Sequence, residues 1–279
     1  MPEDIKHIHS YYSPSGLYEK ILQGLNTLCV DSSKVTLDDL KPVDEFHIRG
    51  DIATKELIKL SGFTPDMHIL DVGCGIGGST RRLSSETGCR VTGIDLSDEY
   101  IDVADRLTNL LNMQEQVKFE ACSALELPFK DNFFDGVWSL QMNMNVEDKL
   151  AWLTETYRVL KPGGRAILYE VCGHKNSPPH FPVPWAQDST MSFLLPPEAF
   201  RDAITSAGFD ISVWNDKTEH AQKSLAHMKE PAGKPNLPPL GLYLLVGEDI
   251  SLKAYNLHRN LNEERVSLIE AVAIKAADR

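Results

Sequence analysis

The chain has 279 residues, which suits one large domain with additions rather than three domains. Hydrophobic residues make up 42% of it and charged residues 24%, as in ordinary globular proteins, which argues against a disordered or fibrous class. A formal net charge of −12, without any stripe of lysine or arginine, argues against a nucleic-acid partner.

The five cysteines are scattered along the chain and none stands in C-x-x-C spacing. We therefore expect neither a disulfide framework nor a metal site, and a reducing cytoplasm fits best. The N-terminus is acidic, and no stretch reaches the roughly 18 apolar residues of a membrane span. We expect a cytoplasmic monomer or homodimer without a membrane span.

Residues 1–60 look helical and aromatic, and we interpret them as an N-terminal cap or lid on a domain that covers 61–279. From Met67 the chain alternates short apolar runs with helical patterns. The runs span 68–73, 90–95, 116–122, 134–140 and 164–171. That alternation predicts an α/β fold with a parallel sheet and helices on both faces.

The pattern changes after a proline-rich loop at 177–184. A helix is expected from near Pro196 to Gly208, followed by a strand at 209–214. Residues 217–262 are interpreted as a helical insertion, because a Pro/Gly-rich stretch precedes apolar positions at 242–261 that suit a helix better than a strand. The run at 266–276 is expected to return to the sheet as the final strand.

The most informative motif is the glycine loop at 71–78, which ends a strand and opens a helix. Its glycines, Gly73, Gly75 and Gly78, let the backbone turn sharply and let a ligand approach closely. This spacing alone fits either a dinucleotide or S-adenosylmethionine. Asp71 favours the second, because a carboxylate sits badly beside a pyrophosphate but attracts an ammonium, directly or through the loop amides.

The second strand ends at Asp95, which Leu96 follows. Nucleotide-binding α/β proteins place an acid at this point to accept hydrogen bonds from ribose hydroxyls. Both residues are therefore expected at the cofactor, although they do not distinguish the two kinds of cofactor.

Taken in order, the glycine loop, Asp95, the turn at 127–129 and the Leu-Lys-Pro-Gly-Gly segment at 160–164 resemble the class I methyltransferase family. The resemblance covers roughly 60–215. It implies a Rossmann-like, mostly parallel sheet of seven strands that binds S-adenosylmethionine and yields S-adenosylhomocysteine. It further implies that the glycine loop holds the methionine part, that Asp95 holds the ribose, and that Ser123 and Ala124 flank the adenine.

More narrowly, the segments 44–50, 138–141, 144–145 and 182–185 resemble small-molecule methyltransferases of the sarcosine/dimethylglycine and tocopherol type. Relatives of the sarcosine type often show a histidine after the fourth strand. This chain has Asn145 there, which removes an obvious base. Ser123 also stands where many relatives carry an aspartate, and a hydroxyl can still accept the adenine amino bond.

Candidate residues for the chemistry lie after the fourth strand and in the cap. We assign a catalytic role to Gln141, Asn145 and His47, and Gln141 is also placed at the cofactor, because ligands gather at this end of open α/β sheets. A further group is assigned to substrate binding: Tyr11, Tyr12, His47, Arg49, His180 and Trp185. The aromatic run at 7–12 is a candidate lid whose rings attract a sulfonium or methylated ammonium. Ordinary packing is the alternative for each of these side chains.

The leading expectation is methyl transfer to a small metabolite, at an amine nitrogen of an amino-acid-like compound. Methyl transfer from a sulfonium requires mainly alignment and exclusion of water, so no dedicated base is needed. The first alternative is an oxygen or carbon acceptor in a phenol, quinol or other small natural product. An NAD-dependent oxidoreductase and a non-catalytic subunit with the same fold are the remaining alternatives.

Overall fold

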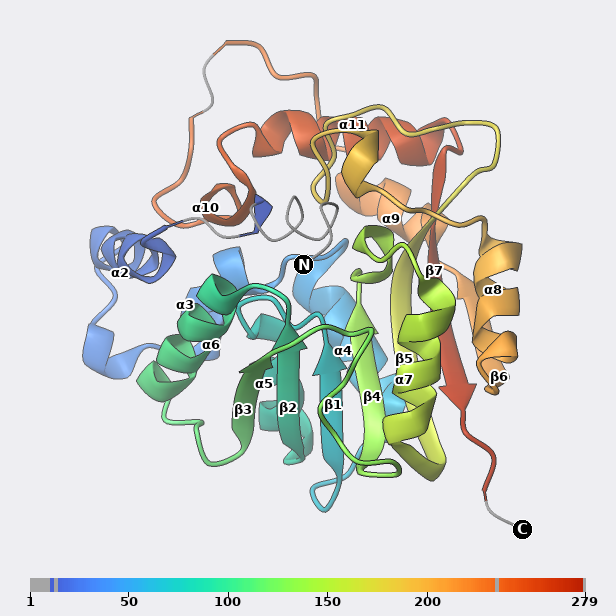
Figure 1. Ribbon diagram of the computed structural model, residues 1–279. Coiled ribbons are helices and arrows are strands. Elements are labelled where there is room, and N and C mark those ends of the chain that lie inside the picture. Colours follow the sequence, from blue (N-terminus) through green and yellow to red (C-terminus); the bar gives the residue numbers. More distant parts are fainter. Residues whose placement is uncertain (1–10, 13–14, 234–235, 278–279) are drawn as a thin grey trace.

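A computed structural model describes residues 11–12, 15–233 and 236–277 of the chain (Figure 1). Seven strands form one sheet in the order β3-β2-β1-β4-β5-β7-β6. Their bounds are β1 (His68–Val72), β2 (Arg90–Asp95), β3 (Val117–Ala121), β4 (Phe134–Leu140), β5 (Leu160–Gly173), β6 (Asp210–Asp216) and β7 (Val266–Ile274). Only β7 runs antiparallel to its neighbours. The expected Rossmann-like, mostly parallel sheet of seven strands is confirmed.

Helices bury apolar side chains on both faces of this sheet. On one face, α4 (Gly50–Ser61) and α5 (Gly78–Thr87) pack Leu57 and Leu83 into a cluster with Trp138 of β4. On the other face, α7 (Lys149–Val159) and α8 (Pro197–Ser206) contribute Trp152 and Phe200. These two layers hold the carboxyl ends of β1, β2 and β4 at one edge of the molecule.

The cap is helical, as the sequence predicts. It contains α2 (Leu17–Thr27), the short 3-10 helix η1 (Ser32–Lys34), α3 (Leu37–Asp44) and α4. A capping box formed by Thr36 and Asp39 begins α3, which satisfies backbone N–H groups that the helix leaves without partners. A third apolar cluster joins α2 and α3 to α6 (Asp98–Leu110) and α10 (Tyr243–Val246), so the cap is packed against the domain.

The late insertion folds as α9 (Thr218–Leu225), α10 and α11 (Ile250–Asn262). The prediction of one helix at 242–261 is therefore wrong in one respect, because the structure has two helices there, α10 and α11. Gly247 lies between the two pieces with φ of +98°, a conformation that L side chains rarely adopt. Figure 1 shows α10 and α11 lying over the carboxyl ends of the central strands.

Most strand and helix ends fall within two residues of the sequence expectation. The exception is β5, which begins at Leu160 rather than Gly164, because Leu160 pairs with Phe134 ahead of an irregularity in the ladder. Two further 3-10 helices, η2 (Asn143–Asn145) and η3 (Ser189–Met191), follow β4 and the proline-rich loop.

Candidate active site

A cavity of about 1050 Å³ opens where β1, β2 and β4 end. This volume lies at the top of the range of roughly 300–1,000 Å³ that is common for small-molecule sites. Twelve of the sequence-predicted residues line it: Tyr12, His47, Arg49, Gly73, Gly75, Asp95, Leu96, Ser123, Ala124, Gln141, Asn145 and Trp185. Four others do not: Tyr11, Asp71, Gly78 and His180.

The glycine loop presents bare backbone to the cavity. Gly73 and Gly75 have φ of +76° and +55°, and a Cβ added to Gly73 would lie 2.3 Å from Met142 Cγ. A Cβ added to Gly75 would meet nothing within 4 Å, so this backbone faces open space that a ligand can fill. The Ile94 carbonyl accepts hydrogen bonds from the N–H groups of Gly73 and Cys74, both at 2.9 Å, which fixes the loop against β2.

Asp95 ties this loop to the next helix. Its Oδ2 accepts a hydrogen bond from the Gly75 N–H and its Oδ1 accepts one from the Ser97 N–H, both at 3.0 Å. Ser97 in turn caps α6 by accepting from the Tyr100 N–H. The carboxylate therefore stands in the cavity wall at the end of β2, where the sequence predicts a ribose-binding acid.

Two glycine-loop residues, Asp71 and Gly78, lie behind the cavity wall. Of the two routes expected for Asp71, direct contact with an ammonium or action through the loop amides, its burial favours the second. Asp71 is 1% exposed, and its Oδ2 accepts hydrogen bonds from the hydroxyls of Thr80, at 2.6 Å, and Ser79, at 3.3 Å. Burial raises the pKa of this carboxyl to about 7. Gly78 faces α3, and an added Cβ would lie 2.0 Å from the Asp44 carbonyl oxygen, so its role is to let α5 pack closely on the cap.

Ser123 and Ala124 lie in the wall beyond β3, beside Cys122. The Cys122 N–H donates to the Asp95 carbonyl at 3.0 Å, which places this turn next to the end of β2. The Ser123 hydroxyl accepts from the Leu125 N–H at 3.2 Å. The turn is therefore held by its own hydrogen bonds at the position where the family resemblance places the adenine.

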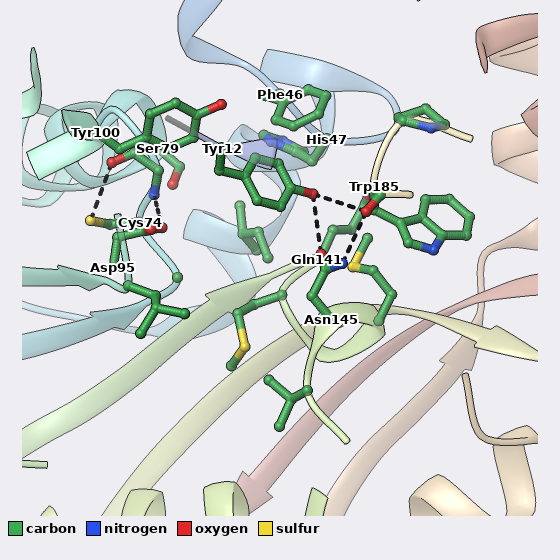
Figure 2. A pocket seen from close by; sticks show the side chains of 18 of the residues that line it. Tyr12, Phe46, His47, Cys74, Ser79, Asp95, Tyr100, Gln141, Asn145 and Trp185 are labelled. Atoms are coloured by element: carbon green, nitrogen blue, oxygen red, sulfur yellow. Dashed lines mark hydrogen bonds between the residues drawn. The ribbon is translucent and has the colours of Figure 1, made fainter. Parts of the chain in front are cut away.

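Asn145, in the cavity wall, forms hydrogen bonds with three separate parts of the chain (Figure 2). Its Nδ2 donates to the carbonyl oxygens of Trp185 and Met191, both at 2.9 Å, and its Oδ1 accepts from the Tyr12 hydroxyl at 3.1 Å. Both amide hydrogens are therefore engaged, and a carboxamide is not a base at neutral pH. The structure gives Asn145 a positioning role, in place of the catalytic role that the sequence suggests.

Tyr12 crosses the cavity mouth from one side to the other. Its carbonyl oxygen accepts from the Ser97 hydroxyl at 2.8 Å, beside Asp95, while its own hydroxyl reaches Asn145. Tyr11 does not line the cavity, and its hydroxyl donates to the carbonyl of the lining residue Pro184 at 3.1 Å. Together they form a strap over the site. The remainder of the aromatic run, at 7–10, lies outside the described residues.

His47 lies in the wall as a neutral ring. Its Nε2 is 3.0 Å from both the Gly50 carbonyl oxygen and the Thr54 hydroxyl. A carbonyl only accepts, so we assign the ring proton to Nε2. Burial lowers the pKa of His47 to about 4, which keeps the ring uncharged at neutral pH.

Arg49, which the sequence assigns to substrate binding, is not an open cation in the structure, so it is not free to orient a substrate carboxylate. Its guanidinium donates two hydrogen bonds to Glu56, at 2.6 and 2.8 Å. A paired carboxylate on the protein competes with any carboxylate of a ligand for the same fork of donors. The expected substrate-orienting role of Arg49 is therefore not supported.

Of the two predicted residues His180 and Trp185, only Trp185 lines the cavity. His180 lies outside the cavity lining, where its Nε2 contacts Glu263 at 2.8 Å and its backbone is held by Asn260. Trp185 lies in the wall, and its Nε1 donates to the Ser192 hydroxyl at 2.9 Å. His180 thus anchors the proline-rich loop to α11, and Trp185 presents a ring to the cavity.

Sequence reasoning missed the apolar wall that the late insertion supplies. Residues from three helices and their connections line the cavity: Leu225, Met228, Leu242, Leu245, Ile250, Ala254 and Leu257. The signal was present in the helical spacing of 242–261. Spacing alone does not say whether such a face covers a core or a ligand.

Within the described ranges, no group of three or more His, Cys, Asp or Glu side chains is arranged to hold a metal ion. Among the same residues, no helix has both the length and the apolar character that crossing a membrane requires.

Comparison with known proteins gives the family. Residues 70–168 match the family described as a methyltransferase domain. The chain is 26% identical to (+)-O-methylkolavelool synthase of Herpetosiphon aurantiacus, over 81% of this chain and 78% of that protein. It is 36% identical to a chloroplastic tocopherol O-methyltransferase of Arabidopsis thaliana, over 44% of this chain and 36% of that protein.

A solved structure of geranyl diphosphate C-methyltransferase from Streptomyces coelicolor A3(2) is similar over 99% of both chains, with a TM-score of 0.72 and 17% identity. It therefore shares the fold. The fold and the family match together identify residues 70–168 and the sheet around them as a class I S-adenosylmethionine-dependent methyltransferase domain. The resemblance predicted from the motifs is confirmed, and the dinucleotide alternative is set aside.

The methyl donor of this class is S-adenosylmethionine, and solved structures with the same fold hold S-adenosylmethionine or S-adenosylhomocysteine. The names of its relatives include N-, O- and C-methyltransferases. The comparisons therefore identify the methyl donor but not the atom that accepts the methyl group.

Proposed function

We propose that this protein transfers the methyl group to a small, uncharged and largely apolar acceptor, at oxygen or carbon. The observation that carries this proposal is the apolar wall from α9 to α11, which lines the same cavity as Gln141 and Trp185. Apolar walls favour apolar ligands, because water leaves both surfaces when they meet. The names of the relatives, which include a tocopherol O-methyltransferase, agree with such an acceptor.

The positively charged side chains of the cavity wall are already paired within the protein, which disfavours an amino-acid-like amine as the methyl acceptor. Among the described lining residues, the fixed cations are Arg49 and Lys149. Arg49 is bound to Glu56, and the Lys149 ammonium donates to carbonyl oxygens, including those of Asn143 and Phe193 at 2.7 Å. A substrate carboxylate would therefore enter without a cation, and burying an unpaired charge is costly.

We further propose how the chain holds the donor. The open backbone at Gly75 fits the methionine part, the Asp95 carboxylate fits the ribose, and the turn at 123–124 fits the adenine. When bound, the cofactor supplies a methyl group on a positively charged sulfur. The chain itself aligns the acceptor and excludes water. In our proposal the strap of Tyr11 and Tyr12 and the lining residues of α10 and α11 exclude the water.

A thermal-shift panel tests this acceptor class. With S-adenosylhomocysteine bound, apolar alcohols and phenols such as 1-naphthol are expected to raise the unfolding temperature further, because they bind only the folded state. Glycine, sarcosine and dimethylglycine are expected to leave it unchanged. Stabilisation by these three amino acids, with none by the apolar compounds, would return the amine proposal to first place.

Cofactor binding is expected to release a proton near pH 7, because the pKa of Asp71 is raised to about 7 in the free protein. Near that pH the carboxyl is partly protonated. An ammonium held above the loop favours the carboxylate, so the pKa falls on binding and the proton leaves. Calorimetry with S-adenosylhomocysteine at pH 7, in two buffers of different ionisation enthalpy, measures the release.

The control is Asp71→Asn, which keeps the shape of the side chain but has no proton to lose. At pH 9 the Asp71 carboxyl of the wild type is already ionised, so any proton release measured there comes from other groups. After this contribution is subtracted, the binding enthalpy of the variant is expected to be the same in both buffers. Equal proton release by the wild type and the variant would show that the proton comes from another group.

A further inference from the structure

Gln141 holds an unusual position in the cavity wall. It follows β4 with φ of +54°, a left-handed conformation that is costly for a residue with a side chain. Its N–H donates to the Tyr169 carbonyl at 2.8 Å, which fixes the backbone in this conformation. Figure 2 shows its side chain among the lining residues, close to Tyr12 and Asn145.

One end of the Gln141 side chain is engaged and the other is not. Oε1 accepts a hydrogen bond from the Ile48 N–H at 3.2 Å. Reversing the carboxamide would set two donors against each other, so this contact fixes which end is the oxygen. Nε2 is buried and, within the described part of the chain, has no hydrogen-bond partner.

Such a donor is expensive in a folded protein. Buried polar groups are nearly always paired, and one that is not costs free energy until a partner arrives. The neighbouring polar groups are already used, since Asn145 bonds to Trp185, Met191 and Tyr12. Strain and an unpaired donor together, in the wall of a ligand cavity, are typical of a recognition contact.

We infer that Gln141 Nε2 donates a hydrogen bond to an oxygen atom of the methyl acceptor, and that it selects hydroxyl- or carbonyl-bearing acceptors over amines. This inference rests on the proposed function, whose apolar wall supplies the remainder of the binding surface. An oxygen has two lone pairs, so it can accept this bond and keep the second free. An ammonium has no lone pair, and a neutral amine has only the one with which it would attack the methyl group.

The test uses three matched probes of nearly equal shape: 1-naphthol, 1-naphthylamine and naphthalene. Binding of each is measured calorimetrically to the full chain saturated with S-adenosylhomocysteine, at pH 8. Wild type is expected to bind 1-naphthol about 10-fold more tightly than either of the other two probes, because its oxygen pairs the buried donor, whereas the arylamine nitrogen is a weak hydrogen-bond acceptor and naphthalene has none.

Two variants separate recognition from folding. Gln141→Glu keeps Oε1 for the Ile48 N–H but replaces the donor with an acceptor, and Gln141→Met removes the polar end. Both are expected to lose the preference for 1-naphthol, and the affinity of each variant for S-adenosylhomocysteine is measured beside it. Gln116→Met, at an exposed position before β3, is the matched control and is expected to keep the preference.

Each other result overturns the inference in a distinguishable way. Equal binding of 1-naphthol and 1-naphthylamine by wild type, or a preference that survives in both variants, removes Gln141 as the selector while the apolar-acceptor proposal stands. Loss of S-adenosylhomocysteine binding in both variants assigns the donor to the cofactor. Binding of none of the three probes to the cofactor-bound protein overturns both the inference and the proposed function.

Discussion

Replacing Asp95 with alanine is expected to weaken binding of S-adenosylhomocysteine by about 100-fold or more. The carboxylate pairs the N–H groups of Gly75 and Ser97 and stands in the wall of the cavity. A hydrogen bond to a charged group contributes about 1.5–3 kcal/mol, and about 1.4 kcal/mol corresponds to a factor of ten in affinity. The variant would lose the proposed ribose contacts together with the hydrogen bond that holds the glycine loop at Gly75.

Calorimetric titration measures this loss, and Asp202→Ala is the matched control. Asp202 is an exposed acid on α8, away from the cavity lining. Its replacement is expected to leave the affinity within a factor of two. An Asp95→Ala variant that folds and still binds S-adenosylhomocysteine within tenfold of wild type would mean that the end of β2 does not hold the cofactor.

Replacing Arg81 with methionine is expected to lower the free energy of unfolding by about 3–5 kcal/mol. Arg81 of α5 is fully buried, and its guanidinium donates to both carboxylate oxygens of Asp44 in the cap, at 2.7 and 2.8 Å. Removing one partner leaves Asp44 charged and unpaired in the interior. Burial already raises the pKa of Asp44, and Arg81 opposes that rise.

Urea unfolding measures the loss, and a double variant shows its cause. Arg81→Met combined with Asp44→Leu replaces the buried pair by apolar side chains, which commonly restores much of the stability. We expect the double variant to unfold at a higher urea concentration than Arg81→Met alone. If both variants unfold at the same concentration, the loss comes from packing of the arginine side chain rather than from the stranded carboxylate.

The sheet could be predicted from the sequence because the patterns that indicate its strands are local. Buried parallel strands appear as continuous apolar runs, and the turns between them carry glycine or proline. The run at 134–140 therefore matches β4 residue for residue. The start of β5 was missed because Leu160 joins the ladder through a pairing with Phe134 that no local pattern encodes.

The site was only partly accessible, because the roles of its polar residues depend on partners brought in by the fold. Asp71 and Asp95 both end strands, yet one lies behind the glycine loop and the other in the cavity wall. Arg49 is paired with Glu56, seven positions later in the sequence, and this pairing depends on how the chain turns into α4.

The same limit applies to the acceptor side. The helical spacing of 242–261 predicted an amphipathic element, but only the fold turns residues such as Leu245 and Leu257 toward the cavity. Gln141 was a candidate from its place after the fourth strand. Its unpaired donor became visible only when the Ile48 N–H was found on the other end of the carboxamide.

The most direct test of the apolar-acceptor proposal is to follow a labelled methyl group from S-adenosylmethionine. The protein is incubated with a mixture of apolar phenols and quinols together with glycine, sarcosine and dimethylglycine, and the labelled products are separated by extraction into an organic solvent at neutral pH. We predict that the label enters the organic phase as methylated apolar product. Label confined to the charged amino acids in the aqueous phase would contradict the account.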